Sequence, residues 1–269
     1  MHPVSVGAAS LACTSTGHGG APALLLHAGV TDQRSWGPLR AAVDGRHRLL
    51  AYDRRGFGAT TYVAEPHSEV DDALAVLDAA GIERATLIGA SNGGKRAIDL
   101  TLAHPDRVTA LALIGSAVRG APEEDPADFG PEVQRLYAAY EAARHGDDLD
   151  QLNRIEAHAW LDGWAAPAGR VTGPVRELFL DMNGSALRSE HPGDEHPLPS
   201  AWDRLGRIAV PTLVLCGDLD VVSLPTSQHL AAEIPGARFE VLRGTAHLPH
   251  LEGHARTLAV IGELLDAVA

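Results

Sequence analysis

Short apolar runs alternate with longer amphipathic segments along most of the chain, and this alternation limits the possible folds more than any other feature. The pattern is typical of parallel β-strands joined by crossover helices. Because the runs are apolar at nearly every position, we expect helices on both faces of the sheet. The runs that we interpret as strands are residues 23–27, 47–52, 85–89, 108–114, 212–216 and 238–242. The sequence therefore predicts an α/β protein with a mostly parallel central sheet.

The segments between these strands have helical spacing. Apolar residues spaced four and three apart predict a helix from Val70 that stops at Gly81. A second helix is expected to start at Ser91, and residues 251–265 are expected to close the chain as another helix. Residues 4–16 are expected to form an antiparallel hairpin before the first parallel strand.

The alternation stops between about residue 118 and residue 199, where a loop rich in Pro, Asp and Glu leads into three amphipathic segments. We therefore expect a helical cap over residues 118–200. It would be inserted after the sixth strand into a core of residues 1–117 and 201–269. For any single apolar residue of the cap, packing is a simpler explanation than ligand contact. Taken together, the segments predict a lid over a pocket, for which the aromatic candidates are Trp160, Trp164 and Phe179.

The composition argues against several classes of partner. The chain has 22 Lys and Arg against 35 Asp and Glu, a net charge of −13 that repels phosphate backbones and anionic membrane surfaces. Two cysteines, Cys13 and Cys216, do not indicate a disulfide framework. No apolar run approaches the roughly 20 residues that span a bilayer, and the first residues do not form a signal peptide. We expect a cytoplasmic protein, monomeric or homodimeric, that binds neither nucleic acid nor membrane.

The strongest chemical motif is Gly89-x-Ser91-x-Gly93, at the junction between a predicted strand and the following helix. The turn there is so tight that small residues are needed two positions on either side of the serine. Such a turn holds the hydroxyl above the sheet. The alternative is a serine that caps a helix in an ordinary turn, but the strand-to-helix position favours Ser91 as a nucleophile.

A serine is a poor nucleophile unless a histidine, oriented by a carboxylate, removes its proton. The strand at 212–216 leads into Asp218 and Asp220, and the last strand leads into His247. Because parallel strands end at the same edge of a sheet, these groups are expected beside the serine. His250 and His254 are the alternative bases. Both lie on or near the final helix, where we expect them at the surface.

With these motifs in place, the whole chain resembles the α/β-hydrolase superfamily, and within it the capped serine esterases and enol-lactonases. In that family the acid lies three residues after the glycine that ends its strand and shortly before a proline, which implies Asp220. The family's histidine motif is matched by residues 244–252, with one glycine replaced, which implies His247 as the base. Asp218 is then expected to bond the backbone of its turn.

The resemblance also implies two backbone N–H groups that hold an oxyanion. One is that of Asn92, the residue after the nucleophile. The other is that of Gly29, because His27-Ala28-Gly29 matches the family's His-Gly-x motif with Ala28 in place of a glycine. His27 is expected to bond backbone. Residues 53–58 match the family's Asp-x-x-Gly-x-Gly turn, which we interpret as structural.

The sequence gives little support for a metal or nucleotide cofactor. Its 14 histidines include no His-x-His or His-Glu-x-x-His arrangement, and the Gly89–Gly94 stretch lacks the spacing of a phosphate-binding loop.

These residues together predict a cofactor-free serine hydrolase that cleaves a small-molecule ester or lactone through an acyl-enzyme. One alternative is a cofactor-free haloperoxidase or a C–C bond hydrolase that uses the same triad. Another is a ligand-binding receptor on a hydrolase scaffold, because fold alone does not fix function.

Overall fold

The computed structural model describes residues 2–43 and 45–269. Its main sheet has seven strands in the order β10-β9-β8-β7-β4-β5-β3. The neighbouring strands are parallel except for β3 and β5, which are antiparallel. The strands are β3 (Cys13–Thr16), β4 (Ala23–Leu26), β5 (Leu49–Tyr52), β7 (Ala85–Ala90), β8 (Val108–Ile114), β9 (Thr212–Gly217) and β10 (Arg238–Leu242). The predicted mostly parallel sheet is confirmed.

The beginning of the chain is more elaborate than the predicted hairpin. β1 (Val4–Val6) and β2 (Ala9–Leu11) pair antiparallel as expected, but β2 also pairs with β6 (Thr61–Tyr62) in a second, three-stranded sheet. β3 then returns to the edge of the main sheet. The inserted helices therefore follow β8, and not a sixth strand. Residues 13–16 were expected to belong to the hairpin but form a third strand, β3, which pairs with β5. β6 is short and polar, so it carries no apolar run from which to predict it.

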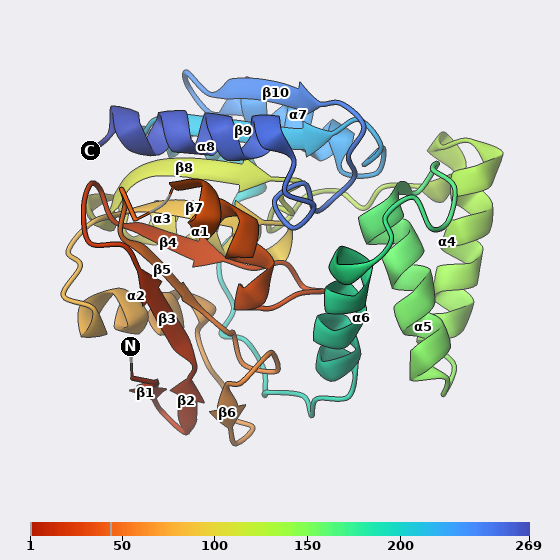
Figure 1. Cartoon of the computed structure of the whole chain (residues 1–269), viewed down its shortest axis with the longest axis horizontal. Coiled ribbons are helices and arrows are strands. Elements are labelled where there is room, and N and C mark those ends of the chain that lie inside the picture. The colour runs from red at the N-terminus through yellow and green to blue at the C-terminus, as the bar shows by residue number, and fades with distance from the viewer. Residues whose placement is uncertain (1, 44) are drawn as a thin grey trace.

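Helices cover both faces of the main sheet, as Figure 1 shows. On one face, α2 (Glu69–Ala79), α3 (Asn92–Ala103) and α7 (Leu224–Glu233) share a buried apolar core with alternate residues of the strands. On the other face, α1 (Gly37–Val43) and α8 (Ala255–Ala267) pack against the intervening residues. Burial on two faces explains why the strand segments are apolar at nearly every position.

The three predicted cap helices are present between β8 and β9. They are α4 (Pro131–Arg144), α5 (Leu149–Glu156) and α6 (Pro174–Leu187), and α5 continues into a wider π-helical segment, Ala157–Gly163. Figure 1 shows these helices beyond the ends toward which β4 and β8 point. The insertion is therefore placed beside the carboxyl edge of the parallel sheet, where ligands bind in open α/β sheets.

The chain that returns from α6 to the core is held along a short strap, residues 190–196. The Glu195 carboxylate pairs with Arg96 of α3 at 3.3 Å and with Arg119 at 2.6 Å. Backbone bonds from Glu65 to Pro192 and from His67 to Asp194, both 3.0 Å, add to these contacts. The carboxyl end of the insertion is therefore fixed to the core.

Among the described residues, no helix combines the length and the apolar composition needed to cross a bilayer.

Candidate active site

Ser91 occupies a strained turn between β7 and α3. Its backbone has φ 53° and ψ −120°, and within residues 2–43 and 45–269 it is the only residue other than glycine with a positive φ. Its N–H donates to the Ile114 carbonyl at 2.9 Å. A Cβ at Gly93 would lie 2.0 Å from the Leu26 carbonyl oxygen, so the helix start touches the neighbouring strand. This is the tight geometry that the Gly-x-Ser-x-Gly spacing predicts for a nucleophile.

His247 and Asp220 come together on the loops that follow β10 and β9. His247 Nδ1 lies 2.7 Å from Asp220 Oδ2, and both side chains are buried. Asp218, the alternative acid, points elsewhere, because its Oδ1 accepts a hydrogen bond from the Gly244 N–H at 2.7 Å. The structure therefore pairs His247 with Asp220, whereas Asp218 bonds the backbone of the loop after β10 and not, as expected, that of its own turn.

Three further residues surround this pair, and none was identified from the sequence. Gly115 has φ +48°, and a Cβ there would lie 2.9 Å from both Asp220 Oδ2 and His247 Nδ1. Ser223 Oγ lies 3.2 Å from His247 Nδ1. Cys216 is a free buried thiol whose pKa is raised to about 12 by burial and by Asp220. The only sequence signal among these is that Gly115 directly follows an apolar strand.

Ser91 and His247 line one cavity of about 210 Å³. The Trp160 ring forms part of its wall, with its centroid 4.8 Å from that of the His247 imidazole. Glu124 and Thr226 add polar groups, and none of the described residues that line the cavity is Lys or Arg. Within the described chain, Ser91 Oγ makes no hydrogen bond to His247. Such bonds are often long in unliganded sites and shorten when a substrate binds.

The two backbone amides predicted to hold an oxyanion lie on adjoining loops. A Cβ at Gly29 would lie 2.5 Å from Asn92 Nδ2, so the loop after β4 touches the first residue of α3. Within the part of the chain that the structure describes, neither the Gly29 nor the Asn92 N–H donates to a protein acceptor. Neither Gly29 nor Asn92 is among the described residues that line the Ser91 cavity, so their role as oxyanion donors stays a prediction.

The structure separates the three aromatic candidates for the pocket wall. Trp160 contacts the Ser91 cavity from the π-helical segment. Trp164 packs against Trp160 with ring centroids 5.1 Å apart, but it lines a different cavity, beside α4. Phe179 is fully buried in the core on the α1 and α8 face. Of the three aromatic candidates, only Trp160 is among the residues that line the Ser91 cavity.

His250 is fully buried, and the expectation that it lies at the surface is wrong. It precedes α8 and stacks on Trp36, with ring centroids 4.3 Å apart. Burial, with a smaller contribution from His247, lowers the pKa of His250 to about 3. Neither of its ring nitrogens has a hydrogen-bond partner among the described residues. His250 is therefore a neutral core residue, whereas His254 caps the first turn of α8.

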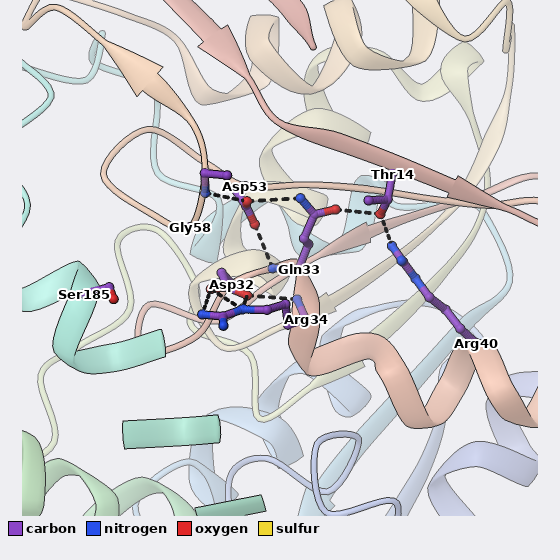
Figure 2. Close-up of a pocket in the computed structure, with 9 residues that line it drawn as sticks. Thr14, Asp32, Gln33, Arg34, Arg40, Asp53, Gly58 and Ser185 are labelled. Carbon is purple, nitrogen blue, oxygen red and sulfur yellow. Dashed lines mark hydrogen bonds and ion pairs between the residues drawn. The ribbon is translucent and has the colours of Figure 1, made fainter. Parts of the chain in front are cut away.

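A larger cavity, of about 460 Å³, lies beside the turn that follows β5 and is drawn in Figure 2. Asp53 crosses it and accepts hydrogen bonds from the Gln33 and Ala59 N–H groups, each at 2.9 Å, and from Gln33 Nε2 at 3.0 Å. Gly58 leaves room for this carboxylate. Asp53 thus stabilises the turn that was predicted to be structural. The nucleophile Ser91 lies in a different cavity, the one of about 210 Å³ described above.

The chain is similar to known proteins over most of its length. Residues 23–260 match the family model described as the alpha/beta hydrolase family. The chain is 29% identical to a 2-hydroxymuconate semialdehyde hydrolase of Pseudomonas sp. (strain CF600), over 93% of this chain and 89% of that protein. It is 26% identical to an esterase of Escherichia coli (strain K12), over 93% and 94% of the two chains.

Solved structures give the same result for the fold. The enol-lactonase from Burkholderia xenovorans LB400 superposes with a TM-score of 0.76 at 25% identity, over 98% of this chain and all of that one. The similar proteins thus include esterases, lactonases and a semialdehyde hydrolase.

Proposed function

Because this chain belongs to the α/β-hydrolase family, we propose that it is a serine hydrolase that cleaves a carboxylic ester or a lactone through an acyl-enzyme intermediate. One observation carries the proposal: His247, which is bonded to Asp220 at 2.7 Å, lines the same cavity as the strained Ser91. This arrangement supports Ser91 as the nucleophile, His247 as the base and Asp220 as the orienting acid.

In this mechanism Ser91 Oγ attacks the substrate carbonyl carbon while His247 Nε2 takes the hydroxyl proton. Asp220 Oδ2 accepts the hydrogen bond from His247 Nδ1, which fixes the ring and stabilises its charged form. The amides of Gly29 and Asn92 hold the oxyanion. His247 then protonates the leaving alkoxide, and a water, activated by the same imidazole, hydrolyses the acyl-enzyme. The helices of residues 118–200 act as the lid that shapes the pocket and excludes bulk water.

The cavity lining favours a substrate that is uncharged at its reacting end. Glu124 contributes a carboxylate to the wall, and none of the described lining residues offers a cation. A small cavity of about 210 Å³ suits a short acyl group or a compact lactone.

A C–C bond hydrolase is the second candidate, because the Pseudomonas relative is named for a muconate semialdehyde. A muconate carries a carboxylate, and repulsion by Glu124 makes such a substrate the less favoured one.

Two readouts on purified wild type and Ser91→Ala test the proposal: turnover of short p-nitrophenyl esters and small lactones, and covalent labelling by a fluorophosphonate. We expect the wild type to be labelled and active, and the variant to lose labelling and at least about a thousandfold of turnover. Labelling without turnover would favour the receptor hypothesis or a C–C substrate. Equal behaviour of the two proteins would show that Ser91 is not the nucleophile.

A further inference from the structure

The carbonyl of Ala28 accepts more hydrogen bonds than a loop carbonyl usually does. His27 Nδ1 lies 2.8 Å from it, Arg54 Nη2 donates to it at 3.1 Å, and the Thr31 N–H donates at 3.4 Å. His27, Arg54 and Thr31 are all buried, so water does not compete for this oxygen. The position of the Ala28 carbonyl is therefore fixed from three sides.

The backbone of Arg54 also decides which ring nitrogen of His27 carries the proton. The Arg54 N–H donates to His27 Nε2 at 3.1 Å, so Nε2 is the acceptor. The proton of the neutral ring is then on Nδ1, which donates to the Ala28 carbonyl. Burial, and then the Arg54 charge, lower the pKa of His27 well below its usual value, which keeps this neutral form.

The Ala28 carbonyl and the Gly29 N–H belong to the same peptide group. No cis peptide bond occurs among the described residues, and in a planar trans peptide the C=O and N–H point in opposite directions. Because the Ala28 carbonyl points toward Arg54, the Gly29 N–H points away from Arg54. A flipped peptide would present a carbonyl oxygen to the substrate and repel an oxyanion.

We infer that Arg54 is a positioning residue, which fixes the Ala28–Gly29 peptide so that the Gly29 N–H faces the oxyanion. This inference rests on the proposed function, because it assigns a role within the same reaction. Arg54 is fully enclosed by its partners: its guanidinium lies 4.5 Å from the Phe57 ring centroid and 3.5 Å from Glu69 Oε1. A buried cation behind the carbonyl also polarises the peptide and strengthens its N–H as a donor.

The simpler alternative is that Arg54 serves only as a buried ion-pair partner of Glu69. Arg96 of α3 provides a control, because its Nη2 lies 3.6 Å from the same Glu69 oxygen and it is also nearly buried. Its second partner, Glu195, keeps its bond to Arg119 at 2.6 Å when the Arg96 guanidinium is removed. Arg96 does not contact Ala28. A purely structural role predicts similar effects of removing either guanidinium, whereas a positioning role predicts an effect on catalysis for Arg54 alone.

The test compares wild type, Arg54→Met, Arg96→Met and Arg54→Lys. The readouts are kcat and KM on the best p-nitrophenyl ester, inhibition by a boronic acid that forms a tetrahedral adduct with serine, and the thermal midpoint. We expect Arg54→Met to lower kcat about 10- to 100-fold with KM within about threefold, a smaller loss than removal of an oxyanion donor causes. Boronic acid affinity should fall by a similar factor. Arg54→Lys should restore part of kcat.

Each other result has a defined meaning. If Arg54→Met and Arg96→Met lower kcat equally, or if Arg54→Met alters the thermal midpoint without altering kcat and boronic acid affinity, the inference is wrong although the proposed function stands. If Arg54→Met fails to fold, Arg54→Lys carries the test, and a Lys variant that folds with the full wild-type kcat and affinity contradicts the positioning role. If the wild type shows no Ser91-dependent turnover, the proposed function itself fails.

Discussion

At the scale of single residues, the assignment of the acid depends on which of two nearby carboxylates faces the histidine. Asp218 and Asp220 follow the same strand two positions apart, and the residues alone leave both open. The structure gives Asp220 the bond to His247 at 2.7 Å and Asp218 a backbone bond to Gly244.

We expect Asp220→Asn to lower kcat by roughly 10³- to 10⁴-fold, because an amide cannot stabilise the charged imidazole and permits the wrong tautomer. Asp218→Asn keeps an oxygen that can accept from the Gly244 N–H, so its kcat should stay within about threefold of wild type, since only a bond between the loops after β9 and β10 is altered. Steady-state kinetics of both variants check this. A large loss in Asp218→Asn with little loss in Asp220→Asn would reverse the assignment of the acid.

Gly115 is a second residue whose surroundings leave no room for a larger side chain. We expect Gly115→Ala to lower kcat at least about tenfold and to destabilise the fold by about 1–3 kcal/mol, because its Cβ meets the Asp220–His247 pair and φ +48° strains an L residue. Gly130 is the matched control, with φ −65° and nothing within 4 Å of an added Cβ. Kinetics and denaturant unfolding measure both effects, and equal behaviour of the two alanine variants would contradict the close approach.

At the scale of secondary-structure elements, the π-helical segment after α5 decides what faces the nucleophile. It places Trp160 over His247, while Trp164, four residues later, lines another cavity. Helical periodicity could not decide which way either indole faces.

We expect Trp160→Ala to shift the preference from short toward longer acyl esters by about tenfold in kcat/KM, because removing the indole enlarges the acyl cavity. Trp164→Ala should leave the preference for chain length unchanged, although it also removes a buried ring. A series of p-nitrophenyl esters from acetate to octanoate measures the ratio in each variant. The same shift in both variants would mean that Trp160 acts through cap packing and not through the cavity wall.

At the scale of the whole molecule, the stability of the fold depends on pH through the buried histidines. His250 has its folded-state pKa lowered from 6.5 to about 3 by burial and by His247. A lowered folded-state pKa contributes stability that is present above the unfolded pKa, near 6.5, and is lost as the pH falls toward 3. Between pH 7 and pH 5 this contribution falls by about 2 kcal/mol.

We therefore expect the free energy of unfolding of wild type to fall between pH 7 and pH 5 by about 2 kcal/mol more than that of His250→Phe, which keeps an aromatic ring against Trp36. Other buried histidines, such as His27, titrate in both proteins and cancel in the difference. Urea unfolding of both proteins at pH 7 and pH 5 measures this difference in the free energy of unfolding. Parallel losses in the two proteins would show that His250 titrates normally in the folded state.

The elements and motifs that have local signatures could be predicted from the residues alone. Apolar runs revealed the six parallel strands, helical spacing revealed the three inserted helices, and the Gly-x-Ser-x-Gly junction identified the strained Ser91 turn. These features depend on residues that are close together in the chain, so they can be predicted without knowledge of the fold. The short polar strand β6 carries no such signature, because long-range pairing alone makes it a strand.

Most contacts between distant side chains became clear only from the folded chain. The family resemblance implied Asp220 and His247, but the structure was needed to find Gly115 and Ser223 against that pair and Arg54 at the Ala28 carbonyl. It also buried His250 and Phe179, which the sequence had assigned to the surface and to the pocket. The physical reason is that these contacts join loops at the ends of separate strands, whose directions follow from sheet order and crossover packing and leave no trace in local spacing.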